Sequence, residues 1–273
     1  MISLVARIGG IGLLGPGLGD WAAAGAVLRG SREHEPRRTE LPAPQLLPAA
    51  ERRRATAAVK LTLASGLQAL AMAQRSADAL RTVFATTGGD GLNCHALCET
   101  LASSERLVSP TRFHNSVHNA ASGYWGIATH SMAPSTVICA ANDGSFAAGL
   151  LEALAQVATS GDEVLLLSYD TDYPEPLRSV RPIPDGFAVA LLLAPDGTHA
   201  QDAGLARIEL DPAAPLTDAP ADSLPQPRLE GMRRAFPAAR ALPLLRRIAL
   251  RESGSVALDY LSDRRLLLRL QAC

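Results

Sequence analysis

Residues 109–130, "SPTRFHNSVHNAASGYWGIATH", hold the densest group of side chains that could do chemistry. Three of the chain's six histidines lie there, with two asparagines and three aromatic residues. Histidine changes charge near neutral pH and serves as a general acid or base. The thiol of Cys139 follows this segment, and with His114 or His118 as its base it could attack a thioester. A catalytic centre is therefore one interpretation of the segment.

The same segment has the features of a contact surface. Residues 120–123 are small, so a helix there could approach a partner closely. Tyr124 and Trp125 would then supply the large contact area typical of interface anchors. In the alternative interpretation, these two aromatic residues belong to the core and the histidines form hydrogen bonds within the fold. Such polar density is costly to bury unless its partners are fixed, which favours the surface interpretation.

The cysteines are consistent with reduced thiols in a cytoplasmic protein. Four are present, Cys94, Cys98, Cys139 and Cys273. The run "CHALC" could offer two thiols and His95 to a metal, but no second ligand pair follows at the spacing of a zinc site. We therefore expect plain helix residues there, with no metal and no cofactor.

Charge and hydropathy exclude several classes of partner. The 26 basic and 27 acidic side chains leave a net charge of −1, too little to attract nucleic acid or an anionic membrane. No apolar run approaches the roughly 18 residues needed to span a bilayer. The apolar N-terminal stretch is broken by glycine and proline, which favours a strand and turn over a signal peptide. We expect a cytoplasmic protein without a membrane span.

The elements that must position these residues alternate between strands and helices. Apolar runs predict strands at 4–14, 136–141, 163–169 and 187–194, and "RTVFATTGGDG" is predicted to be a strand that ends in a glycine turn. Helical spacing predicts helices at 21–28, 49–73, 92–103 and 145–158. The nearly continuous apolar strands indicate an α/β sheet covered on both faces. We predict a single domain over 1–273, with its main α/β unit in 1–200.

The C-terminal quarter has a different composition. Five prolines fall in "DPAAPLTDAPADSLPQP", so 202–231 is predicted to be a long loop. A helix near 232–250 and two short strands, "VALDYL" and "RLLLRL", complete the predicted 232–273 segment. The sequence therefore predicts one complete layered unit, followed by only a few short elements.

Four stretches together resemble the β-ketoacyl synthases. They are "VARIGGIGLLGPGLGDW", "FATTGGDG", "SPTRFHNSVHNAASGYWGIAT" and "APSTVICAANDGSFAAGLLEAL". In that family the corresponding segments are the first strand, a glycine turn, the region of the dimer interface and acyl tunnel, and the strand, elbow and helix that present the nucleophile. The similarity runs from Ser3 to Ala194 and is greatest to the chain-length factors of aryl polyene biosynthesis. It implies an α/β, thiolase-like layered fold with a complete first half and a truncated second half.

The resemblance places Asn142 at the elbow, where a condensing enzyme needs cysteine. An amide cannot accept an acyl chain as a thiolate does. Cys139 lies three residues earlier, and we interpret it as a packed strand residue. Moving the elbow to Cys139 would spoil the spacing to Phe146 and Glu152 on the next helix.

The histidines required for condensation are also missing. The family takes two from its second half, where they stabilise the developing enolate and oxyanion. Downstream of Asn142 this chain has only His199, which we expect in a turn. Residues of the 109–130 segment would instead line an interface or tunnel. The predicted tunnel and interface residues are Phe113, His114, Asn115, Val117, His118, Asn119, Tyr124, Trp125 and Phe146.

The resemblance thus implies a non-catalytic chain-length factor. It would form a heterodimer with a full-length β-ketoacyl-ACP synthase, meet the acyl carrier protein through that complex, and close the acyl tunnel during synthesis of a polyene chain. The alternative is a stand-alone acyl thioesterase or acyltransferase that uses Cys139. A third hypothesis is a homodimer that serves as a scaffold for other enzymes.

Overall fold

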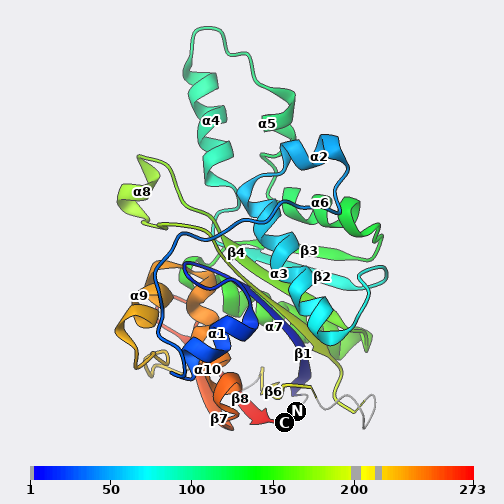
Figure 1. The fold of residues 1–273 in the computed structure, drawn as a ribbon, viewed down its shortest axis with the longest axis vertical. Coiled ribbons are helices and arrows are strands. Elements are labelled where there is room, and N and C mark those ends of the chain that lie inside the picture. The colour runs from blue at the N-terminus through cyan, green and yellow to red at the C-terminus, as the bar shows by residue number, and fades with distance from the viewer. Residues whose placement is uncertain (1–2, 198–203, 213–216) are drawn as a thin grey trace.

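The computed structural model describes residues 3–197, 204–212 and 217–273. A mixed eight-stranded sheet with the strand order β3-β2-β4-β5-β1-β6-β8-β7 forms its centre (Figure 1). The strands are β1 (Leu4–Leu14), β2 (Arg81–Thr86), β3 (Ser135–Cys139), β4 (Val164–Asp170), β5 (Phe187–Ala194), β6 (Ala206–Leu210), β7 (Gly254–Asp259) and β8 (Arg265–Ala272). Strand β2 pairs in parallel with β3 and β4, whereas the neighbouring pairs from β4 to β7 run antiparallel.

Helices cover both faces of the sheet, as predicted. The α-helices are α1 (Trp21–Leu28), α2 (Ala49–Arg54), α3 (Ala57–Ala73), α4 (Gly91–Ala102), α5 (Pro110–His114), α6 (Ala120–Thr129), α7 (Ser145–Ser160), α8 (Leu177–Val180), α9 (Pro227–Ala235) and α10 (Leu242–Leu250). Two short 3-10 helices are η1 (Asn142–Gly144) and η2 (Ala238–Ala241). Helices α3 and α6 pack on one face, and α7, α1, α10 and η2 on the other.

Alternation along the central strands explains this arrangement. Successive side chains of a strand point to opposite faces. Leu165 and Leu167 of β4 join the core beneath α3, whereas Val164 and Leu166 join the core beneath α7. Because both faces are covered, all seven residues of β4 are buried. The continuous apolar runs of the sequence are therefore the signature of a strand between two helical layers.

Two predicted elements differ from the observed ones. The single helix predicted over 49–73 is broken into α2 and α3, because Ala55 has an extended backbone and Thr56 begins a new helix. The helix predicted over 232–250 is interrupted at Phe236, which is also extended. In both places the apolar spacing continues across the break, so the pattern alone could not reveal it.

The prediction of a loop throughout 202–231 was wrong in part. Strand β6 lies inside this range and hydrogen-bonds to both β1 and β8. Its sequence "ARIEL" is only five residues long, and buried and half-buried positions alternate along it. Helix α9 also begins within the range, with Pro227 in its first turn, where the missing N–H of proline costs nothing. The prolines therefore mark the ends of elements here.

Helices α4 and α5 form a hairpin that projects from the body of the molecule (Figure 1). The side-chain amide of Asn93 donates to the carbonyl of Arg112 (2.8 Å) and joins the two helices. The amide of Asn115 donates to the carbonyl of Arg54 (3.0 Å) and ties the end of α5 to α2. No helix among the described residues is long and apolar enough to cross a bilayer.

Helices α3 and α6 approach closely at Gly66. A Cβ atom at this position would lie 2.5 Å from the buried ring of Trp125 and 2.8 Å from the side chain of Leu167. The Trp125 ring also packs edge-on against Phe84 of β2, with 6.4 Å between the ring centroids. A glycine in α3 therefore lets the indole lie between the helix and the sheet.

Replacing Gly66 by alanine should destabilise the fold by about 1–3 kcal/mol, because the added methyl group overpacks the core. Urea unfolding of the purified chain measures this change. The matched control is Gly123→Ala on α6, where an added Cβ meets nothing within 4 Å. This control should be neutral or gain up to about 1 kcal/mol. A Gly66→Ala variant as stable as the control would contradict the close approach.

Candidate functional site

The strand, elbow and helix predicted around Asn142 are present. Strand β3 ends at Cys139, the chain turns through η1, and α7 begins at Ser145. Ala141 and Asn142 have φ values of 64° and 47°, a left-handed conformation that non-glycine residues rarely adopt. The side-chain oxygen of Asn142 accepts a hydrogen bond from the Thr87 hydroxyl (3.2 Å). An amide thus stands at the tip of the elbow, just before the 16-residue helix α7.

The elbow packs against the C-terminal strands. A Cβ atom on Gly144 would lie only 1.7 Å from the carbonyl oxygen of Tyr260, next to the end of β7. No side chain fits there, so glycine permits the contact. The short C-terminal segment therefore forms part of the wall around Asn142.

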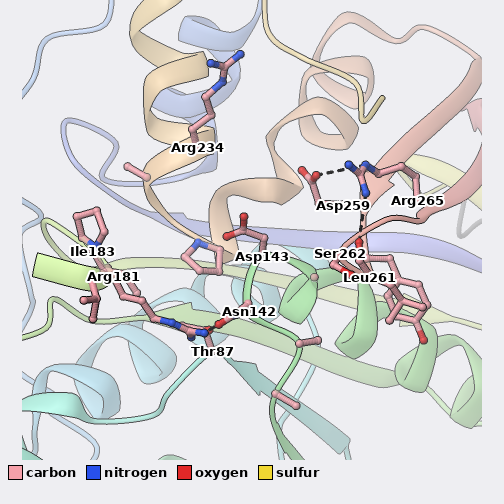
Figure 2. Close-up of a pocket in the computed structure, with 18 of the residues that line it drawn as sticks. Thr87, Asn142, Asp143, Arg181, Ile183, Arg234, Asp259, Leu261, Ser262 and Arg265 are labelled. Carbon is pink, nitrogen blue, oxygen red and sulfur yellow. Dashed lines mark hydrogen bonds and ion pairs between the residues drawn. The ribbon is translucent and has the colours of Figure 1, made fainter. Parts of the chain in front are cut away.

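A cavity of about 1080 Å³ opens beside the elbow. Thr87 and residues 140–144 form one wall, residues 180–184 another, and α9 with the segment 259–265 the third (Figure 2). None of the described residues that line it is a cysteine or a histidine. The described lining thus presents the amide of Asn142 and contains no imidazole that could act as acid or base.

Ion pairs hold the C-terminal segment on the elbow. Asp259 accepts from Arg233 (2.6 Å) and Arg240 (3.2 Å), and Arg240 also binds Asp143 of η1 (2.8 Å). Arg233 is largely buried and donates to Glu230 (2.8 Å), which lowers the pKa of Glu230 to about 2. Removing one partner would leave the other charge buried and unpaired, so this network restrains α9, η2 and β7 together.

Asp170 at the end of β4 is a completely buried carboxylate beneath the elbow. One oxygen accepts from the backbone N–H of Thr87 (3.0 Å) and the hydroxyl of Thr86 (3.4 Å). The other accepts from the backbone N–H of Ala238 (2.7 Å). Burial raises the pKa of Asp170 to about 7, although these three donors oppose the shift. One carboxylate thus joins the loop that carries Thr87 to the start of η2.

Cys139 is not placed as a nucleophile. It ends the edge strand β3 and does not line the cavity. Cys139 is exposed, so the interpretation as a packed strand residue was wrong: no described element covers the end of this edge strand. Partial burial, and then the charge of Asp170, raise the pKa of Cys139 above its ordinary value. No hydrogen bond joins it to His114 or His118 in the described part of the chain, and His114 instead packs edge-on against Tyr124 (6.0 Å between centroids). The constellation required by a thioesterase is therefore not assembled.

The predicted tunnel and interface residues fall into two groups. Tyr124, Trp125 and Phe146 are at most 2% exposed, so within this chain they are core residues. The burial of Tyr124 and Trp125 agrees with the alternative interpretation, in which both residues belong to the core. Their interpretation as surface anchors was wrong. Phe113 and Val117 are 68% and 49% exposed.

The remaining polar members of this set lie near the same hairpin. His114, His118 and Asn119 are exposed, whereas Asn115 is buried with its amide on the Arg54 carbonyl. His199 lies outside the described residues. Cys94 and Cys98 are exposed on α4, and no group of three metal-ligating side chains converges anywhere in the described ranges. Exposed members of the set remain candidates for contact with a partner.

Sequence reasoning missed the acidic and basic residues of the elbow. Asp170, Arg233, Arg240 and Asp259 are scattered over 90 positions and meet only in the folded chain. The one local signal is Asp170 itself, a charged residue that ends the apolar strand "VLLLSYD". Such a residue is rarely buried unless specific partners hold it.

Titration of Asp170 should make the free energy of unfolding depend on pH. The folded state holds a proton that the unfolded chain releases between about pH 4 and pH 7, so the contribution of Asp170 falls as pH rises through this window. The stability of the native chain minus that of Asp170→Asn should therefore shrink over this range, by on the order of a few kcal/mol. Urea unfolding at pH 4.5 to 8 measures the difference.

Asp196→Asn is the control. Hydrogen bonds from Arg207 and Arg7 hold the pKa of Asp196 below its ordinary value, so its contribution to stability is already complete at pH 4.5 and the corresponding difference should stay constant up to pH 8. A difference for Asp170→Asn that stays constant from pH 4.5 to 7.5 would rule out its titration.

The thiol of Cys139 should react slowly. Because its pKa is raised, it is protonated at pH 7, and only the thiolate is alkylated. Iodoacetamide should label it no faster than glutathione at pH 7, with the rate rising toward pH 10. Mass spectrometry of the native chain and of Cys139→Ser identifies the adduct. Labelling more than tenfold faster than glutathione would instead favour the thioesterase hypothesis.

Comparisons with known proteins agree with this geometry. The profile described as "Beta-ketoacyl synthase, N-terminal domain" matches residues 28–229. The solved complex of the ketosynthase ApeO with its chain length factor ApeC from Xenorhabdus doucetiae contains a similar chain, 22% identical with a TM-score of 0.68. That match covers 97% of this chain and 99% of the other. No curated protein sequence matches significantly.

Two further structures have the same fold. The ishigamide ketosynthase/chain length factor matches with 14% identity and a TM-score of 0.71, over 98% of this chain and 99% of the other. The ketosynthase from module 6 of the Bacillus subtilis bacillaene synthase, with 15% identity and a TM-score of 0.55, is matched over 79% of this chain but only 43% of its own. The predicted thiolase-like α/β fold with a shortened second half is thus confirmed. The chain belongs to the β-ketoacyl synthase family, through the part described as its N-terminal domain.

Proposed function

We propose that this chain is a non-catalytic, chain-length-factor-like subunit that pairs with a full-length β-ketoacyl-ACP synthase. The observation that carries the proposal is the side chain at the tip of the elbow, which is the amide of Asn142, held by the Thr87 hydroxyl. No cysteine or histidine among the described residues lines its cavity. A fold that presents an amide in the position of the nucleophile is suited to pairing with a catalytic subunit.

The similarity to subunits of ketosynthase complexes supports this role. The matched chains in the ApeO and ApeC complex and in the ishigamide complex are covered almost completely by this chain. Both structures are described as a ketosynthase with a chain length factor. A third structure contains an acyl-carrier protein bound to its ketosynthase. In the proposed complex, the acyl carrier protein would likewise bind the ketosynthase and reach this chain through it. The growing chain would be an aryl polyene.

Strand β3 offers a surface for pairing. It is an edge strand, bonded to β2 on one side only. Its bonds with β2 begin at the carbonyl of Pro134 and end at the N–H of Ala140. In a parallel ladder alternate residues bond to one neighbour, so Val137 directs its N–H and carbonyl outward. An unblocked edge of this kind can accept a strand from another chain.

The α4–α5 hairpin provides a second exposed surface, which is apolar. Large apolar side chains that are at least 44% exposed follow one another from α4 to the start of α6: Leu92, Leu101, Leu107, Phe113 and Val117. An isolated chain rarely presents so many on one projection, and such surfaces mark sites of protein contact. We assign the hairpin and the β3 edge to the synthase partner, with Phe113 and Val117 as candidates for shaping its acyl tunnel.

Replacing Val137 by proline should abolish pairing with the synthase and leave the fold intact. Proline removes the outward N–H of an edge strand without breaking a bond to β2. The tagged chain is co-expressed with a full-length β-ketoacyl-ACP synthase from the same organism, and size-exclusion chromatography with mass determination measures the complex. Val137→Thr is the matched control, because it keeps the N–H and the branched side chain.

The native chain and Val137→Thr should give a one-to-one complex, and Val137→Pro should give none. Phe113→Ala should weaken the complex or lengthen the product by one or more extension units, read by mass spectrometry. A native chain that never associates with the ketosynthase would refute the proposed function. A complex that survives Val137→Pro would refute the β3 edge as its pairing surface.

A further inference from the structure

The carboxyl group of Asp170 is buried without a cation beside it. Its three hydrogen-bond donors are the backbone N–H groups of Thr87 and Ala238 and the hydroxyl of Thr86, and none of these donors carries a charge. No ion pair joins Asp170 to an arginine, lysine or histidine of the described residues. A carboxylate buried without a cation is costly to ionise, so this group favours its neutral, protonated form.

The surroundings of Asp170 reinforce this preference. Burial first, and then the negative charge of Asp143 on η1, raise the pKa of Asp170 to about 7. The guanidinium of Arg240 on η2 binds Asp143 and β7 instead, Asp90 of the loop after β2 caps α4, and the neighbour on β5 is Phe187. The other titratable groups that interact with this carboxyl group are neutral at pH 7, because their pKa values are raised: Cys139 at the end of β3, Tyr169 on β4 and Tyr173 in the loop after β4.

Asp170 joins two segments that fix the tip of the elbow. In the described contacts the backbone N–H of Thr87 donates to Asp170 alone, and the hydroxyl of Thr87 donates to Asn142 (3.2 Å). Ala238 begins η2, and its N–H also donates to Asp170 alone. Two residues later, Arg240 binds the carboxylate next to Asn142 (2.8 Å). Separation of these two segments from Asp170 would therefore loosen both contacts of the elbow.

We propose that Asp170 is a pH-sensitive switch that controls how readily the elbow opens. While its carboxyl group is protonated, it stays buried and holds the two segments together, because each oxygen keeps a lone pair that accepts an N–H. When the segments separate, water reaches the carboxyl group, which then releases its proton to the solvent. This inference does not rest on pairing with a synthase, since every group named belongs to this chain.

The direction of the pH dependence follows from the two states. The hydrated carboxyl group of the open state ionises near the ordinary value of about 4, whereas the closed state keeps its proton up to about pH 7. Opening therefore releases a proton within this window, and each pH unit should make it about tenfold more favourable. Above about pH 7.5 both states are ionised, and the opening no longer depends on pH. Acidification below pH 7 thus tightens the elbow.

Hydrogen exchange of the Thr87 and Ala238 amides, followed by NMR of the full chain from pH 5 to pH 8.5, measures the opening. Base-catalysed exchange by itself accelerates about tenfold per pH unit, and the pH-dependent opening multiplies it. Both amides should accelerate about a hundredfold per unit between pH 5 and pH 6.5, and about tenfold above pH 7.5. Both should also exchange faster than the amide of Leu167, which lies in the core and reports global unfolding.

Three variants assign the effect to Asp170. Asp170→Asn should leave an acceleration of about tenfold per unit at every pH. Asp143→Asn removes the charge that opposes ionisation, so the change of slope should move to lower pH, and its 60% exposed side chain makes the substitution compatible with the fold. Asp162→Asn is the matched control, because Asp162 is also exposed (57%) and paired with an arginine (2.9 Å), but precedes the opposite end of β4. This control should not change the profile.

Three results would overturn the proposal. One is an acceleration of only about tenfold per unit for both amides of the native chain below pH 6.5. Another is a profile that neither Asp170→Asn nor Asp143→Asn changes. The third is exchange of both amides no faster than that of Leu167, because the segments would then separate only when the whole chain unfolds. Since Asp143→Asn tests the same charge from the surface, the experiment does not depend on whether Asp170→Asn folds.

Discussion

The carboxylate of Asp170 is the interaction on which the arrangement of the elbow depends. It lies at the end of a fully buried central strand and accepts hydrogen bonds from the loop after β2 and from the first residue of η2. An uncompensated buried charge would be costly, so each donor must keep its place. The loop after β2 in turn holds Asn142 through Thr87. Two parts of the chain 150 residues apart are thus fixed to one side chain.

A second consequence concerns the shortened C-terminal part. In this chain β7 and β8 extend the same sheet, and α9 and η2 return to the elbow. Arginine and aspartate side chains from these elements surround the cavity, where a condensing enzyme would need histidines to stabilise an enolate.

The aromatic residues of the 109–130 segment show where patterns in sequence are ambiguous. Tyr124 and Trp125 look like interface anchors because large aromatic residues are frequent in both cores and interfaces. Their burial was decided by Gly66 on α3, about 60 positions earlier, which leaves room for the indole against the sheet. The local sequence around Tyr124 and Trp125 contains no information about this distant glycine.

By itself, the sequence determined the central strands, the helices that cover them and the position of the elbow, because apolar periodicity and glycine turns are local properties. The contiguous motif around Asn142 also predicted that an amide occupies the position of the nucleophile. Only the tertiary structure decided which charges meet. Asp170, Arg240 and Asp259 have no local pattern, and ion pairs form between residues whose proximity depends on the path of the whole chain. Burial of a side chain is likewise set by its neighbours in space, so the choice between core and surface lay beyond the sequence.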